Sequence, residues 1–227
     1  MIFSILRYDL TTGKLIALLL LVVFGLMVAI VSRTLAQGYV AYKCGDGTPK
    51  ATGRLTLNPL AHLDPWGFIC FILCGIGWSK SMPINPTNFK KFRSGIAWVS
   101  ISGILVNLIL CILASFLYVL TLNTLGDSAD VIVIALYWFM YANAFLIAFN
   151  ILPIFPLDGF TFVSSFMKPN SKFVQGNIKY GAKILLGVLV VDLVLNLLFD
   201  FSIISFVLVW LADKICVPLC KLWSLMF

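Results

Sequence analysis

The chain has no glutamate, and His62 is the one histidine among its 227 residues. Enzymes that use zinc to hydrolyse peptide bonds commonly bind the metal through two histidines and use a carboxylate as the general base. The composition therefore excludes a standard zinc hydrolase centre made of two histidines and a catalytic glutamate. Charge is scarce as well, because Asp, Glu, Lys and Arg together make up 11% of the residues.

Apolar residues dominate what is present. They make up 61% of the chain, and the mean hydropathy is +1.05, far above the balance of a soluble protein. A length of 227 residues allows about five or six membrane crossings of roughly 20 residues each. We therefore expect an all-α integral membrane protein that forms a single membrane domain over residues 1–227.

Five apolar runs are long enough, or nearly so, to cross the hydrocarbon core, at residues 15–31, 96–122, 131–152, 184–199 and 202–219. A shorter run, residues 66–78, contains three glycines and is flanked by Pro65 and Pro83. It fits a re-entrant hairpin buried against the bundle better than a full crossing, which is the alternative. The prediction is about five transmembrane helices plus a re-entrant hairpin.

The net charge of +7 does not indicate nucleic-acid binding, because the 16 Lys and Arg residues are spread through short loops. In a membrane protein such charges indicate which loops face the cytoplasm. Three loops are basic, at residues 33–54, 80–93 and 168–183, and basic loops usually face the cytoplasm. Of the six cysteines, all but Cys44 lie in apolar segments, where a thiol packs as a small hydrophobic group. No disulfide framework is predicted.

Several motifs follow one another along the chain. Residues 38–46 read G-Y-V-A-Y-K-C-G-D, residues 53–65 read G-R-L-T-L-N-P-L-A-H-L-D-P, and residues 150–159 read N-I-L-P-I-F-P-L-D-G. The dipeptide Gly77-Trp78 precedes P-I-N-P at 83–86, and residues 102–107 read S-G-I-L-V-N. Together they resemble the motifs of short bacterial site-2 proteases, zinc metalloproteases that cut inside membranes. The match to the family's A-G-P-x-x-N motif is partial, because Ile104 stands in place of proline.

The resemblance implies a site-2 protease core over about residues 15–160, followed by extra C-terminal helices over residues 182–222. In active relatives an H-E-x-x-H helix supplies two zinc-ligand histidines and the catalytic glutamate, and the aspartate of the L-D-G motif supplies the third ligand. Counting back from Gly38 places the three H-E-x-x-H positions at Arg33, Thr34 and Gln37, whereas Asp158 is the retained ligand position. Arginine repels a cation, threonine is no base near neutral pH, and glutamine is a weak ligand. No catalytic or metal-binding set is intact, and no cofactor is predicted.

The substitutions share a physical pattern. A buried carboxylate without a cation is costly, so Asp158 needs a charge to replace the metal. Arg33 and Gln37 are four residues apart and lie on one face of a helix. We predict an ion pair between Arg33 and Asp158, with Gln37 beside it. The alternative is that Arg33 extends to the membrane interface while Asp158 accepts hydrogen bonds from loop amides.

The resemblance also implies a role in substrate binding for residues of the other motifs, namely Asn150, Pro153, Pro156, His62 and Asn107. For Asn150, capping of a helix near Pro153 is an equal alternative. The extended stretch at residues 45–58 is a candidate edge for pairing with a substrate strand.

Asp64 and Asp192 are two further acids with a predicted role. A substitute metal site made of His62, Asp64 and Asp158 would still lack a glutamate base, so we expect the His62-x-Asp64 segment to shape a loop or position a substrate. Asp192 lies within an apolar run and is expected to cap a helix or to hydrogen-bond within the bundle, with Asn196 as a candidate partner.

The leading functional prediction is a pseudoprotease: a multi-pass protein of the cell membrane that binds or regulates transmembrane segments of membrane protein partners within the lipid bilayer. One alternative is an active intramembrane zinc metalloprotease with non-standard ligands. Another is a small transporter or ion pathway, for which Asp158 and Asp192 are the candidate intramembrane acids. The partner and the oligomeric state are left open.

Overall fold

The computed structural model describes residues 5, 8–65, 67, 79–125, 130–199 and 202–226. Regular structure in this part of the chain is helical, apart from one antiparallel bridge between Leu63 and Ser79. Four of the described helices are long and apolar enough to cross a membrane. The protein is thus an all-α membrane protein, as the composition predicted. The predicted re-entrant hairpin, residues 66–78, lies outside the described residues apart from Gly67.

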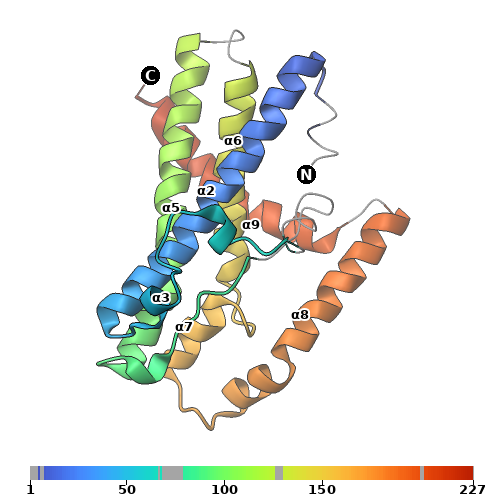
Figure 1. Cartoon of the computed structure of the whole chain (residues 1–227). Helices are drawn as coiled ribbons and strands as arrows, with labels where there is room; N and C mark the ends of the chain where they lie inside the picture. Colours follow the sequence, from blue (N-terminus) through green and yellow to red (C-terminus); the bar gives the residue numbers. More distant parts are fainter. Residues whose placement is uncertain are drawn as a thin grey trace.

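Three of the four long helices pack against one another and form the centre of the molecule, and the fourth, α9, packs against two of them (Figure 1). Each contains or closely matches one of the predicted apolar runs, because a run of this length satisfies its backbone hydrogen bonds in lipid only as a helix. Their bounds are Thr12–Cys44 for α2, Phe92–Leu125 for α5, Asp130–Asn150 for α6 and Ile203–Ser224 for α9.

The core between these helices is apolar and rich in small residues. One cluster joins α5, α6 and α9 through Cys111, Met140, Ala212 and Cys216, all of which are fully or almost fully buried. The two cysteines therefore pack as small hydrophobic groups, as predicted. Small residues let helix backbones approach closely, which is the usual basis of helix packing in membranes.

The end of α2 is fixed by Gly45 and Asp46. Gly45 has a φ of 114°, a left-handed conformation that glycine adopts without strain. The fully buried Asp46 carboxylate accepts hydrogen bonds from the amide and hydroxyl of Thr48, from the Asn85 amide at 2.7 Å and from the Asn88 side chain at 3.0 Å. Burial alone would raise the pKa of Asp46, but these hydrogen bonds outweigh it and lower the pKa overall. Asp46 thus ties the loop after α2 to the segment before α5.

Short elements connect the long ones. The stretch expected to be extended, residues 45–58, instead contains the helix α3 (Thr48–Ala51), so that expectation was wrong for this part. Pro49 at the start of α3 has a fixed φ that suits a first helical turn. The 3-10 helices η1 (Pro59–Ala61) and η2 (Pro86–Asn88) follow, and α7 (Asp158–Phe166) comes after the proline-containing turn that ends α6.

The helix α8 (Lys172–Phe199) contains the fourth predicted run but stands away from the bundle along much of its length (Figure 1). Asp192 connects its distal part to α9: its carboxylate accepts a hydrogen bond from the Ser202 hydroxyl at 2.7 Å and from the Ile204 amide at 2.8 Å. Asp192 therefore helps to cap α9, and the capping role predicted for it is confirmed with Ser202 and Ile204 as partners in place of Asn196.

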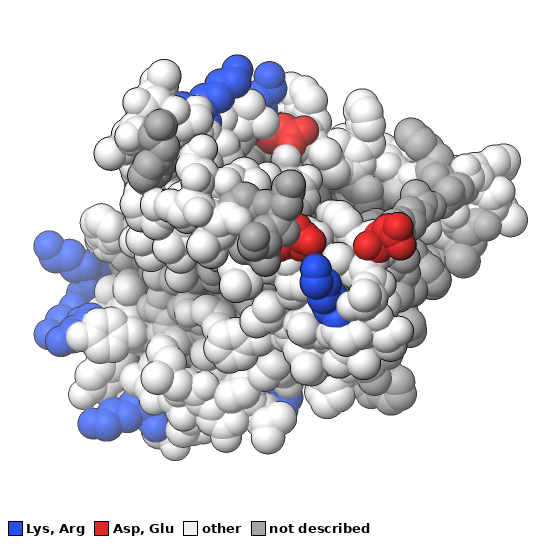
Figure 2. Space-filling view, turned by 90° about the horizontal axis from the view of Figure 1, so that it is seen from above, with Lys and Arg blue, Asp and Glu red and all other residues white. Residues whose placement is uncertain are grey.

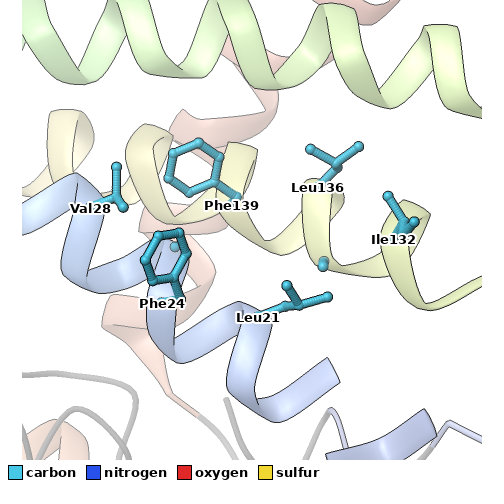
Figure 3. Close-up of a pocket in the computed structure, with 8 residues that line it drawn as sticks. Leu21, Phe24, Val28, Ile132, Leu136 and Phe139 are labelled. Carbon is cyan, nitrogen blue, oxygen red and sulfur yellow. The ribbon is translucent and has the colours of Figure 1, made fainter. Parts of the chain in front are cut away.

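An apolar groove of about 450 Å³ lies between α2 and α6. Figure 3 shows Phe24 and Phe139 facing each other across it, and Gly25 permits this approach, because an added Cβ would lie 2.9 Å from the Phe139 ring. The groove is near the beginning of both helices, whereas the polar residues described below lie toward their ends. It is lined by Leu21, Phe24, Gly25, Val28, Ile132, Ala135, Leu136 and Phe139.

Charge is distributed unevenly between the two ends of the bundle. The end of α2 and the beginnings of α5 and α8 lie at one end of the molecule, which brings the three basic loops together there (Figure 1). Figure 2 looks onto the opposite end, where most of the surface is uncharged and acidic side chains lie toward the middle of the view. At that end the exposed Lys14 and Asp130 side chains lie 3.3 Å apart.

Candidate functional site

Arg33, near the last third of α2, is the centre of a polar cluster inside the helical bundle. Its Nη2 donates a hydrogen bond to Asp158 Oδ2 and another to Asn150 Oδ1, the latter at 2.6 Å. Gln37 Nε2 donates to the same Asp158 oxygen at 2.9 Å. The side chains of Arg33 and Asp158 are only 13% and 15% exposed. The predicted ion pair is confirmed, and Arg33 does not extend to the interface.

Local geometry explains how these side chains meet. Positions 33 and 37 share one face of α2, and Gly103 on α5 faces them: an added Cβ there would lie 2.9 Å from Arg33 Cγ and 3.1 Å from Gln37 Nε2. Asp158 begins α7 directly after the turn that ends α6. Gly159 is needed next to it, because an added Cβ would lie only 2.1 Å from the Ile151 carbonyl oxygen.

Thr34, which stands at the position of the family's glutamate, has a different partner. Its hydroxyl lies 2.8 Å from His62 Nδ1, and His62 Nε2 lies 2.7 Å from the Thr56 carbonyl oxygen. Because a carbonyl oxygen only accepts hydrogen bonds, Nε2 donates to Thr56, and the Thr34 hydroxyl also lies 2.9 Å from the Ile30 carbonyl oxygen of its own helix. Thr34 and His62 are 1% and 0% exposed. His62 thus fixes the 56–62 loop onto α2, and both of its nitrogens are engaged.

Asn107 shares a face of α5 with Gly103, one turn further along, and is fully buried. Neither its Oδ1 nor its Nδ2 has a hydrogen-bond partner in the described part of the chain, and the same is true of Arg33 Nε. Buried polar groups are normally paired, so these atoms have capacity for a ligand. The other two residues predicted to bind substrate, Pro153 and Pro156, are exposed in the turn between α6 and α7.

The chain is similar to a curated protein named "Putative zinc metalloprotease YwhC" from Bacillus subtilis (strain 168), with 38% identity over 177 residues. These residues are 75% of this chain and 80% of the relative. This chain belongs to the site-2 protease family. The resemblance seen in its motifs is therefore confirmed.

A second relative is named "Putative zinc metalloprotease Rip2", from Mycolicibacterium smegmatis (strain ATCC 700084 / mc(2)155), and is 26% identical over 228 residues, 93% of this chain and 84% of the relative. No protein-family model matches the chain. No solved structure matches it either.

The residues at the family's zinc position do not fit zinc. A zinc ligand offers a lone pair from nitrogen, oxygen or sulfur, and only Asp158 of the four positions offers a carboxylate. That carboxylate already accepts hydrogen bonds from the Arg33 guanidinium and the Gln37 amide. The positive charge of the guanidinium would also repel a metal ion. Nor do the described residues contain another group of three His, Cys, Asp or Glu side chains arranged to hold a metal. Asp64 instead accepts a hydrogen bond from the Gly67 amide at 2.9 Å.

Two polar contacts were not predicted. The contact between Asn150 and Arg33 links residues 117 positions apart, which no local pattern reveals. On α9, Asp213 accepts a hydrogen bond of 2.6 Å from the Tyr141 hydroxyl on α6. A signal for Asp213 was present in the sequence, because it is an acid inside the apolar run 202–219.

Proposed function

We propose that this member of the site-2 protease family is a pseudoprotease, which binds transmembrane segments of other membrane proteins and does not cleave them. The observation that supports the proposal is the Arg33–Asp158 ion pair, in which a permanently charged guanidinium contacts the carboxylate that the family resemblance makes a zinc ligand. We also propose that the protein is a multi-pass protein of the cell membrane whose basic loops face the cytoplasm.

Hydrolysis of a peptide bond needs an activated water and a base, and the site offers neither. Thr34 has no proton-accepting group that works near neutral pH, and its hydroxyl is engaged with His62. Arg33 carries a permanent charge and cannot take up a proton. The ion pair meets the charge requirement of the buried Asp158, so the fold remains intact without the chemistry.

Binding has support of a different kind. Within the described residues, the Asn107 side chain and Arg33 Nε are buried without a hydrogen-bond partner, and Asn107 lies one helical turn from Gly103, which faces Arg33. A transmembrane helix interrupted by proline has backbone groups that are freed from their internal hydrogen bonds. Such freed groups are complementary to an asparagine side chain, which both donates and accepts. The partner class is therefore a membrane segment with a break in its helix.

The test uses the full chain in phosphatidylcholine vesicles and a labelled leucine-based membrane peptide with a central Asn-Pro, beside a matched all-leucine peptide. Binding is measured by energy transfer, and the mass of each peptide is measured after incubation. We expect tighter binding of the interrupted peptide and no cleavage. Asn107→Leu is expected to remove the difference, whereas Asn123→Leu, at an exposed position of the same helix, is expected to keep it. Cleaved peptide, or equal binding of both peptides, contradicts the proposal.

A further inference from the structure

Among the described acids of the apolar helices, Asp213 has the fewest hydrogen-bond partners. It lies near the middle of α9, one of the helices able to cross a membrane. Asp158 has a guanidinium and an amide, and Asp192 has a hydroxyl and a backbone amide. Asp213 has the Tyr141 hydroxyl. An ionisable side chain at membrane depth indicates a functional site that needs a partner.

No cation of the described residues pairs with Asp213. The ion pairs found in this part of the chain are Lys14 with Asp130 and Arg33 with Asp158. The adjacent Lys214 does not face Asp213, because neighbouring residues of a helix point in different directions. Its ammonium lies over the Trp210 ring, 5.4 Å from the ring centroid. No described residue therefore supplies a positive charge to Asp213.

Asp213 lies between the core-facing and the exposed side of α9, because its carboxylate contacts Tyr141 on α6 while the residue stays partly exposed. Ala212 and Cys216 face the core, whereas Phe206, Trp210 and Val217 are 66%, 55% and 43% exposed. These three residues are separated from Asp213 by seven, three and four positions, which places them along one stripe of the helix. Asp213 itself is partly exposed in the middle of that stripe. The stripe thus combines apolar contact area with one negative charge.

We propose that this stripe of α9 docks a transmembrane helix that carries a lysine or arginine near its middle, with the basic side chain paired to Asp213. The negative charge of the carboxylate favours a basic partner, because a basic residue buried in lipid is stabilised by an acid on the helix that it packs against. The exposed aromatic residues supply packing surface on either side. The stripe lies on α9, whereas Arg33 lies on α2 and Asp158 on α7. A helix can therefore dock on the stripe whatever the Arg33–Asp158 centre binds.

The test again uses the full chain in phosphatidylcholine vesicles, with two acceptor-labelled leucine-based membrane peptides that differ at one central position, lysine or leucine. We expect the lysine peptide to bind about tenfold more tightly than the leucine peptide. Asp213→Asn is expected to abolish this preference, and Asp213→Glu is expected to keep it. Asp130→Asn serves as the matched control, because it removes an exposed acid at the first residue of α6. We expect it to leave the preference for the lysine peptide unchanged.

Equal binding of the two peptides to the native chain overturns the proposal. A lysine preference that persists in Asp213→Asn, or that is lost in Asp213→Glu as well, also overturns it. Energy transfer between two labelled copies of the chain, present without peptide and lost in Asp213→Asn, would assign the stripe to a second copy instead. Asn107→Leu, which tests the Arg33–Asp158 centre, does not change the lysine preference, so the two proposals fail separately.

Discussion

Asp158 and Asp213 are both acids within an apolar helical bundle, but they are stabilised in different ways. Asp158 lies in the family core, where a cation and an amide from α2 occupy its carboxylate. Asp213 lies on the last helix, where a neutral hydroxyl is its partner and one side of the helix is exposed. Asp158 is paired with a cation of the same chain, whereas the described residues give Asp213 a neutral hydroxyl. A charge that is satisfied internally stabilises a fold, whereas one that is not indicates binding.

Removal of the Arg33 guanidinium beside Asp158 should lower the stability of the protein more than any other change predicted below. Arg33→Leu leaves Asp158 buried beside Gln37 with no positive charge, and we expect it to lower the free energy of unfolding by about 3 to 5 kcal/mol. Unfolding by SDS from mixed micelles provides the measurement. The double variant Arg33→Leu, Asp158→Leu removes both charges and should recover most of the loss. If the double variant is as unstable as the single one, the charge argument is wrong.

A steric change should displace Asp158 without altering its charge. Gly159→Ala places a methyl group against the Ile151 carbonyl, and the required backbone shift should cost about 1 to 3 kcal/mol in the same unfolding measurement. Gly176→Ala in α8 is the matched control, because no atom lies within 4 Å of its added Cβ. Equal stability of the two variants would show that the turn at the start of α7 adapts freely.

Neutralising Asp158 and Asp213 one at a time compares how much each acid contributes to the free energy of unfolding. Asp158→Asn leaves Arg33 buried without its carboxylate and should cost about 2 kcal/mol or more. Asp213→Asn should change the free energy of unfolding by less than about 1 kcal/mol, because the asparagine oxygen can still accept the hydrogen bond from Tyr141 and the group is partly exposed. A larger loss in Asp213→Asn than in Asp158→Asn would reverse the distinction between them.

Asp46 adds a third acid, outside the membrane span, whose expected effect depends on pH. Its pKa in the folded protein is lowered by hydrogen bonds, so its stabilisation is complete above the ordinary aspartate pKa of about 4 and is lost as the pH falls through the lower folded value. Asp46→Asn should therefore be less stable than the native chain by about 1 kcal/mol at pH 7, and the gap should narrow below pH 4. A gap that is constant from pH 7 to pH 3 would contradict this.

The long helices could be predicted from the sequence because each corresponds to an apolar run that only a helix can satisfy in lipid. Arg33 and Asp158 could be paired because the motifs fix both positions in the family core. Other features depend on tertiary contacts that the sequence does not encode locally. The contact of Thr34 with His62 requires the loop at residues 56–62 to fold onto α2, and the cap that Asp192 provides requires α9 to return to α8.

Asp213 was overlooked for a different reason. Its residue type and position were visible, but it lies outside the motifs that identify the family, and its exposure depends on which face of α9 meets the bundle. Small residues at positions 212 and 216 determine that face, and they attract less attention in a sequence than an acid does. Helices outside a family core are therefore a place where individual charges should be examined one by one.

The most direct test of the central claim is the zinc content of the purified chain in detergent, beside a variant that combines Arg33→His, Thr34→Glu and Gln37→His. We expect no stoichiometric zinc in the native chain and about one zinc per molecule in the variant, because the variant regains two histidine ligands next to Asp158. Addition of Asp158→Asn to that variant should reduce its zinc content again. One zinc per molecule in the native chain would contradict the account, since the ion pair could not then occupy the metal's position.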